Sequence, residues 1–216
     1  QYFGDARSFD RKVLGGCDGV VYLAAISNDP MGKMYESLTD EVNNISCIRW
    51  AKAAKDAGVR SFVLASSCSV YGTTDDSPKK ETDPLNPLTA YARSKINAET
   101  SLEKLADKSF YITCLRFATA CGMSDRLRTD LVLNDFVFNV LENRKINILS
   151  NGKPWRPLID VSDMARAIQW GLQREGDSFL TINAGSSEWN FQVLALAENV
   201  QSFFPDARIS INENAP

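Results

Sequence analysis

Residues 65–72 read ASSCSVYG and follow directly on three apolar residues, 62–64. A buried parallel strand reads as a near-continuous apolar run, whereas this one ends in the small polar side chains of residues 66–69. Polar side chains at the end of such a strand either form a turn or line the floor of a site. The sequence on either side of this stretch is needed to distinguish these two interpretations.

Short β-branched runs alternate with amphipathic stretches along the rest of the chain. This alternation predicts an α/β fold, with a doubly wound, Rossmann-type parallel sheet covered by helices on both faces. The expected strands are residues 20–25, 61–66, 111–117, 146–150, 179–184 and 208–211, and the expected helices are residues 36–57, 89–107, 130–143, 162–173 and 190–203.

Composition excludes several classes of protein. The formal net charge is −3, so no basic field would attract nucleic acid or an anionic membrane. No apolar run is long enough to span a bilayer, and residues 1–20 do not resemble a signal peptide. Five irregularly spaced cysteines argue against a disulfide framework. We therefore expect a cytoplasmic protein without nucleic-acid or membrane partners.

The chain contains no histidine. This absence excludes Ser-His-Asp and Cys-His nucleophilic sites and histidine-based zinc sites, and we expect no metal centre. Proton transfer near neutral pH would then require a carboxylate, a lysine, a cysteine or a tyrosine of shifted pKa.

The sequence YARSK, residues 91–95, provides such a pair. Tyr91 and Lys95 are four residues apart in an expected helix, so they share one helical face. A lysine ammonium stabilises a phenolate and lowers a tyrosine pKa that is otherwise about 10. Ser67 could hydrogen-bond the same substrate oxygen and hold it against Tyr91. The alternative is a surface tyrosine that packs on a lysine stem.

Together, the strand ending in SSCSVYG, the loop of residues 72–88 with three prolines, and the YARSK helix resemble one family. They are similar to extended short-chain dehydrogenase/reductases, specifically the NAD-dependent nucleotide-sugar epimerase/dehydratase group. The resemblance covers nearly the whole chain and implies NAD as cofactor. It also implies that Ser67, Tyr91 and Lys95 are the catalytic residues.

Further segments resemble the cofactor-binding motifs of this family. They are FGDARS at residues 3–8, VVYLAAIS at 20–27, EVNNIS at 41–46 and CLRFATACG at 114–122. Besides Tyr91 and Lys95, the cofactor-binding residues that the resemblance implies are Asp5, Ala6, Leu23, Ala24, Ala25, Ser27, Asn43 and Ala118.

The substrate-binding residues implied in the same way are Ser67, Ser69, Thr119, Asn134 and Arg156. Arg156 occupies the position of a family arginine that contacts the substrate diphosphate, a role that suits a guanidinium fork. The alternatives are a surface ion pair for Arg156 and an ordinary polar position on a helix exterior for Asn134.

The resemblance also implies a division of the chain. Residues 1–118 would form the NAD-binding portion without its first, glycine-rich βαβ unit, since no G-x-x-G-x-x-G turn occurs in the sequence. Residues 119–216 would form a smaller substrate-binding portion, partly interleaved with the first. We expect the 216-residue chain to bind NAD weakly or not at all. Family members dimerise through helices that correspond to residues 36–57 and 89–107, so the resemblance also implies a homodimer.

Two residues bear on the reaction. Family dehydratases carry Asp-Glu directly after the motif hydroxyl residue, and this chain has Cys68 and Ser69 there. The interpretation is therefore a nucleotide-sugar epimerase that oxidises a hydroxyl and reduces the same carbon again. A dehydratase or keto-reductase of the same family, and a non-catalytic truncated relative, remain the alternatives.

Overall fold

The computed structural model describes residues 3–8, 10–27, 29–72 and 77–212. The chain divides into two compact units. Unit 1 comprises residues 1–117 and 166–183, and unit 2 comprises residues 118–165 and 184–216. Each unit is therefore built from two stretches of chain, so neither is continuous in sequence. Of the long loop expected at residues 72–88, residues 73–76 lie outside the described ranges.

The described part of unit 1 contains a sheet with the strand order β1-β2-β3-β7. Its strands are β1 (Gly19–Tyr22), β2 (Ser61–Ser67), β3 (Tyr111–Phe117) and β7 (Phe179–Ala184). β1 and β3 both run parallel to β2, and the last pair in the β2–β3 register is Ser67 with Phe117. The expected α/β class with a parallel sheet is confirmed.

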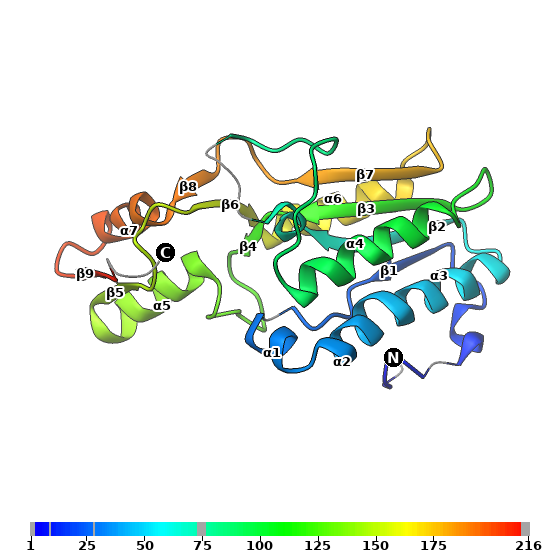
Figure 1. Cartoon of the computed structure of the whole chain (residues 1–216), viewed down its shortest axis with the longest axis horizontal. Coiled ribbons are helices and arrows are strands. Elements are labelled where there is room, and N and C mark those ends of the chain that lie inside the picture. Colours follow the sequence, from blue (N-terminus) through cyan, green and yellow to red (C-terminus); the bar gives the residue numbers. More distant parts are fainter. Residues whose placement is uncertain (1–2, 9, 28, 73–76, 213–216) are drawn as a thin grey trace. The chain divides into compact units, whose positions relative to one another are not determined.

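Helices cover both faces of this sheet (Figure 1). Phe62 and Leu64 of β2 pack with small residues of α3 and α4, such as Ala51 and Ala98. Val63 faces the opposite side, where Gly171 of α6 comes so close that an added Cβ would lie 3.2 Å from it. The helical segments are η1 (Arg11–Leu14), α1 (Asp29–Met34), α2 (Glu36–Asp40), a π-helical turn η2 (Glu41–Ser46), α3 (Cys47–Asp56), η3 (Cys68–Tyr71), α4 (Ala90–Glu103) and α6 (Val161–Gln173).

Unit 2 has its own core. Phe136 and Val140 of α5 (Val132–Asn143) pack with Leu196 of α7 (Val193–Ser202) and with the apolar residues of the neighbouring strands. β4 (Thr119–Cys121) runs parallel to β6 (Trp155–Asp160), which pairs antiparallel with β8 (Asn190–Gln192), and β5 (Lys145–Ile148) runs parallel to β9 (Arg208–Ile211).

Some predicted boundaries are wrong. β1 ends at Tyr22 and not at residue 25, because the backbone of Ile26 is hydrogen-bonded to the Asn43 side chain and the chain leaves the sheet. Residues 190–192, predicted as the start of a helix, pair with β6 instead. The elements α1, β4, β6 and β8 were not predicted, because they are short and lack a periodic apolar pattern.

Within the described ranges, no helix combines the length and the apolar character that crossing a membrane requires.

Candidate active site

Ser67 is the last residue of β2 and the N-cap of the short helix η3. Its Oγ accepts hydrogen bonds from the backbone N of Ser69 at 3.2 Å and from the Ser69 Oγ at 3.0 Å. Both bonds use lone pairs of Ser67, so they leave the hydroxyl proton to be donated elsewhere. The two interpretations of the polar strand end are therefore compatible: the side chains cap a turn, and Ser67 keeps a donor.

Tyr91 and Lys95 lie at the start of α4. Thr89 is the N-cap of this helix, and its Oγ1 accepts a hydrogen bond from the N of Ala92. The Lys95 Nζ is 5.5 Å from the centroid of the Tyr91 ring, which is within the range of a cation–π contact. It also donates a 2.7 Å hydrogen bond to the carbonyl of Ala65, two residues before Ser67.

Lys95 is buried, with 1% of its surface exposed. Tyr91 itself is half-buried, so the pair is not an exposed tyrosine on an exposed lysine, and its catalytic role stays a prediction. Burial disfavours the charged ammonium and lowers the pKa of Lys95 to about 8. Burial also raises the pKa of the neighbouring Cys47 thiol to about 12, so that thiol is neutral at pH 7 and does not compensate the lysine charge.

Asn43 lies in the π-helical turn and is fully buried. Its Oδ1 accepts a 2.8 Å hydrogen bond from the N of Ile26, and its Nδ2 donates to the Ile26 carbonyl and to the Ser94 Oγ. Ser94 in turn donates to the carbonyl of Tyr91 at 2.7 Å. The predicted cofactor residue therefore connects the loop after β1 to the turn of α4 that carries Tyr91.

The other residues predicted to bind the cofactor after β1 lie in the loop that Asn43 holds. Leu23 is 59% exposed, although it is a large apolar side chain. Ala24 and Ala25 are half-buried and Ser27 is exposed. Because this loop follows the carboxyl end of a parallel strand, it lies where α/β sheets bind their ligands.

Asp5 and Ala6 form the remaining predicted cofactor segment of unit 1. The Arg7 guanidinium binds both oxygens of Asp5, and its hydrogen bonds lower the pKa of that carboxyl to about 2. The carbonyl of Ala6 accepts a 2.9 Å hydrogen bond from the indole N of Trp50 in α3. The segment is thus fastened to α3, while the Asp5 side chain stays 44% exposed.

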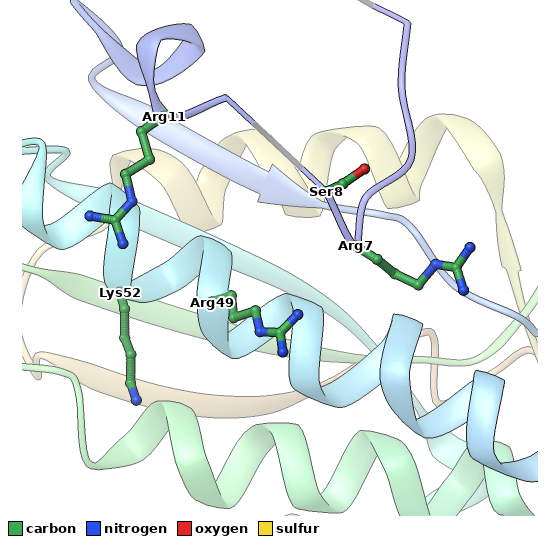
Figure 2. Close-up of a pocket in the computed structure, with 5 residues that line it drawn as sticks. All are labelled: Arg7, Ser8, Arg11, Arg49 and Lys52. Carbon is green, nitrogen blue, oxygen red and sulfur yellow. The ribbon is translucent and has the colours of Figure 1, made fainter.

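A basic pocket of about 440 Å³ begins at the same arginine (Figure 2). It is lined by Arg7, Ser8, Arg11, Arg49 and Lys52. The whole chain carries a formal charge of −3, so this concentration of cations is local. Arg7 is paired with Asp5 and Glu41, so the attraction of this pocket for anions comes from Arg11, Arg49 and Lys52.

Unit 2 contains the other predicted residues. The backbone N of Ala118 donates to the Ala184 carbonyl at 2.9 Å, and Thr119 opens β4 opposite Leu158 of β6. Asn134 donates from Nδ2 to the Arg128 carbonyl and accepts at Oδ1 from the N of Gly122. Its amide therefore fixes a loop of unit 2, a role that sequence analysis did not predict.

Arg156 lies on β6, opposite Phe191 of β8. It is exposed, and its Nη1 donates to the carbonyl of the preceding Trp155 at 2.8 Å. Because a backbone carbonyl is neutral, this hydrogen bond does not neutralise the positive charge of Arg156. The substrate roles of Thr119, Asn134 and Arg156 therefore stay predictions.

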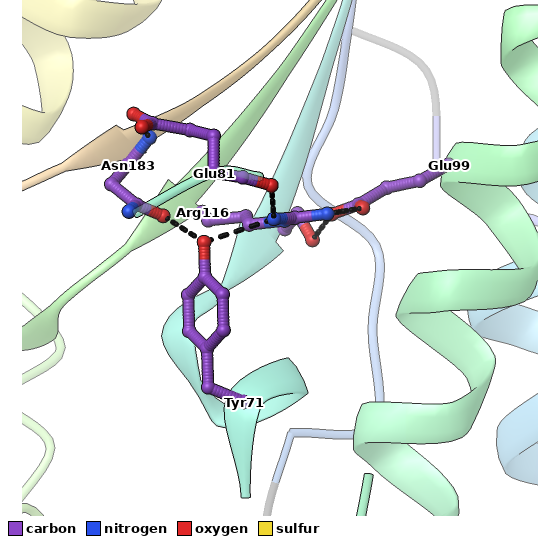
Figure 3. Close-up of polar contacts among 6 residues, drawn as sticks. Tyr71, Glu81, Glu99, Arg116 and Asn183 are labelled. Carbon is purple, nitrogen blue, oxygen red and sulfur yellow. Dashed lines mark hydrogen bonds and ion pairs between the residues drawn. The ribbon is translucent and has the colours of Figure 1, made fainter. Parts of the chain in front are cut away.

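Sequence analysis missed a buried polar cluster beside Ser67 (Figure 3). Arg116 of β3 and Glu99 of α4 form an ion pair of 2.7 Å, and each side chain is 6% exposed. Ser66 donates to Glu99, and Arg116 donates to the hydroxyl of Tyr71. Two signals could have revealed it: Arg116 interrupts an otherwise apolar strand, and Glu99 lies one turn after Lys95 on the same helical face.

Within the described ranges, no three histidine, cysteine, aspartate or glutamate residues are grouped as metal ligands would be. In unit 1 the buried Lys95 ammonium lies at the Tyr91 ring and is hydrogen-bonded to Ala65, on the strand that ends in Ser67. Such a set could bind a substrate oxygen and take its proton without a histidine: the ammonium stabilises the phenolate form of the tyrosine, and the phenolate becomes a phenol when it accepts the proton.

The chain is similar to known proteins over most of its length. A family model described as "NAD dependent epimerase/dehydratase family" matches residues 4–185. The uncharacterized UDP-glucose epimerase YtcB of Bacillus subtilis (strain 168) is 28% identical over 195 residues, which cover 87% of this chain and 60% of that protein. The dTDP-glucose 4,6-dehydratase of Streptomyces griseus is 26% identical over 160 residues, 74% of this chain and 48% of that protein.

Among solved structures, MoeE5 in complex with UDP-glucuronic acid and NAD has a TM-score of 0.87 to this chain. The alignment covers 97% of this chain and 70% of that one at 24% sequence identity, so it shows a common fold. The chain spans 60% and 48% of the lengths of the two sequence relatives.

The buried lysine gives a prediction for stability. Between pH 8 and 10.5 the folded chain has released the Lys95 proton while the unfolded chain retains it, so the free energy of unfolding rises with pH. Relative to Lys95→Met, which lacks this titration, the stability of the parent should increase by about 3 kcal/mol over that range. Denaturant unfolding at several pH values measures the difference, with Lys104→Met, an exposed lysine at the end of α4, as matched control. A difference that does not change with pH would contradict the burial of a titrating ammonium.

Proposed function

Because the chain belongs to the NAD dependent epimerase/dehydratase family, whose members are NAD-dependent enzymes of nucleotide-sugar metabolism, we propose that it is a nucleotide-sugar epimerase. The observation that carries the proposal is the position of Lys95. Its ammonium is buried at the ring of Tyr91 and bonded to the strand that ends in Ser67. This arrangement supports a tyrosine base in a chain without histidine.

The residues of unit 1 fit the cofactor. Asp5 is half-exposed, and carboxylate oxygens can accept hydrogen bonds beyond those from Arg7, so Asp5 could accept one from the adenine amino group. The basic pocket that starts at Arg7 favours an anionic dinucleotide nearby. The other proposed cofactor contacts of unit 1 are Ala6, Leu23, Ala24, Ala25, Ser27 and Asn43. Ala118 belongs to unit 2, and its cofactor role stays a prediction from the sequence. When bound, NAD supplies the acceptor and donor of the hydride.

The chain's own residues perform the remaining steps. Ser67 donates its free proton in a hydrogen bond to the reacting sugar oxygen and places it against Tyr91. The Tyr91 phenolate takes the proton of the sugar hydroxyl as the carbonyl forms, and the phenol returns it when the other face of that carbon is reduced. Lys95 has three N–H donors, and one of them binds the Ala65 carbonyl. The other two are available to stabilise the phenolate and to hold the cofactor ribose.

The residues after Ser67 favour epimerisation over dehydration. Loss of water from a sugar requires an acid and a base beyond the tyrosine, and the two following positions are Cys68 and Ser69. The Ser69 hydroxyl donates to Ser67, and a serine needs an activating partner to act as a base. One-way reduction of a keto sugar needs the same three residues and is the second candidate.

We propose a nucleoside-diphosphate sugar as substrate. The contacts predicted for it from the sequence, which stay proposals, are Ser67, Ser69, Thr119, Asn134 and Arg156. The exposed guanidinium of Arg156 suits a diphosphate. A homodimer through residues 36–57 and 89–107 is part of the proposal. It is supported by the packing of α2 on α4 and by the exposed Ile45 between α2 and α3. The cytoplasmic location stays a prediction.

The first test replaces the base. Tyr91→Phe in the complete gene product should lower turnover at least 100-fold, because one oxygen is removed and with it the proton acceptor. Dissociation constants for NAD and the sugar nucleotide should stay close to those of the parent, since the ring is retained. Tyr111→Phe is the matched control, because Tyr111 begins β3 beside Ser61, at the end of the sheet away from Ser67. Turnover within a few-fold of the parent in Tyr91→Phe would remove Tyr91 from the reaction.

The second test identifies the reaction. The complete gene product is incubated with NAD and a panel of UDP-, GDP-, CDP- and dTDP-sugars, and products are separated and weighed by mass spectrometry. We expect a product of unchanged mass and new retention time, because oxidation and reduction at one carbon only invert it. A product lighter by one water would contradict the epimerase proposal and favour a dehydratase. If no sugar nucleotide is converted while NAD is bound, the non-catalytic alternative would replace it.

A further inference from the structure

The polar cluster beside Ser67 is built around a buried ion pair. Arg116 places Nε 3.2 Å from both oxygens of Glu99 and Nη2 2.7 Å from Oε2, so the pair is bidentate. Both side chains are nearly inaccessible to solvent. A buried pair is often no more stabilising than apolar residues of the same volume, because both charges lose their hydration. Because the pair lies next to the proposed catalytic residues, we consider whether it fixes the positions of the elements that carry them.

One side of the pair holds the end of β2. The Ser66 hydroxyl donates a short hydrogen bond to the Glu99 Oε1, and the Lys95 Nζ donates to the Ala65 carbonyl. Lys95 and Glu99 are four residues apart on α4, so one helical face is hydrogen-bonded to two consecutive residues of β2, Ala65 and Ser66. Side chains alternate along a strand, so fixing Ser66 on one face fixes the direction of Ser67 on the other.

The other side of the pair holds the segments that follow Ser67. The Arg116 Nη1 donates to the Tyr71 hydroxyl at 2.9 Å and to the Glu81 carbonyl at 3.3 Å. Tyr71 ends the short helix that Ser67 caps, and its hydroxyl donates to the Asn183 Oδ1 at 2.7 Å. The N of Asn183 donates to the Glu81 side chain at 2.8 Å. The turn after Ser67 is therefore fixed at both ends, by Ser67 itself and by Arg116 through Tyr71.

We propose that Glu99 and Arg116 are positioning residues for the reaction, which set the Ser67 hydroxyl and the Lys95 ammonium in their working places by locking β2, η3 and α4 together. The inference rests on the proposed function, since it gives these two residues their task. Neither residue touches the substrate in this proposal. Both act through the elements that carry Ser67 and Lys95.

The test must separate positioning from simple stability. Glu99→Gln keeps the shape but leaves the Arg116 charge buried without its partner, so the midpoint of thermal unfolding should fall. Glu99→Leu combined with Arg116→Met fills the same space without charge, and we expect this double variant to recover the midpoint. The double variant is therefore folded but lacks every contact of the pair.

In the double variant, turnover should remain lowered 10- to 100-fold with KM changed less than 3-fold, because a displacement of about 1 Å at the reacting groups has effects of this size. Hydrogen exchange should accelerate at least 10-fold at the amides of Ser69 and Gly72, which bond within the turn, while the amides of β3 stay protected. Glu175→Gln, which removes an exposed ion pair with Arg60, is the control and should change neither measurement.

A double variant with recovered midpoint, parental turnover and parental exchange at Ser69 and Gly72 would show that the pair only contributes to stability, and would overturn the inference. Accelerated exchange with lowered turnover supports it. The exchange measurement does not need a substrate, so it decides the structural part of the inference even if the parent proves inactive and the proposed function falls. Parental exchange at both amides would overturn that structural part by itself.

Discussion

A lysine ammonium with 1% of its surface exposed needs strong local compensation, and unit 1 provides it around Lys95. The Lys95 Nζ donates a hydrogen bond to the Ala65 carbonyl and lies 5.5 Å from the centroid of the Tyr91 ring. The Glu99 carboxylate is one helical turn further along α4. Since the chain has no histidine, we propose that this buried cation makes Tyr91 usable as a base near neutral pH. The burial of the Lys95 Nζ and the proposed activation of Tyr91 therefore depend on the same contacts.

The same helix connects the rest of the site to this cation. Three residues of α4 make these contacts: Ser94 binds Asn43 behind the loop after β1, Lys95 binds the backbone of β2, and Glu99 belongs to the polar cluster. Each contact ends on a backbone atom or a buried side chain of a different segment. One helical face thus fixes the elements that carry the proposed cofactor and catalytic residues, and the strength of each contact depends on the exclusion of water around it.

Much of this could be predicted from the sequence, because the information was local. The alternation of strands and helices and the four-residue spacing of Tyr91 and Lys95 depend on periodicity alone. The role of Asn43 could not be predicted, because its partners Ile26 and Ser94 become neighbours only in the folded chain. The strands of unit 2 that were missed, such as β8, are defined by pairing with β6 and not by their own composition.

We propose that the buried Lys95 ammonium lowers the pKa of Tyr91 enough for proton transfer. The most direct measurement is a pH titration of the chain labelled with ¹³C at tyrosine Cζ, with Tyr91→Phe to assign the resonance and Lys95→Met as the comparison. We predict that Tyr91 titrates at least two pH units below the ordinary tyrosine value of about 10, in the range where Lys95 still carries its proton, and that this shift disappears in Lys95→Met. A Tyr91 resonance that titrates at or above the ordinary value, and in the same way in both proteins, would contradict the account.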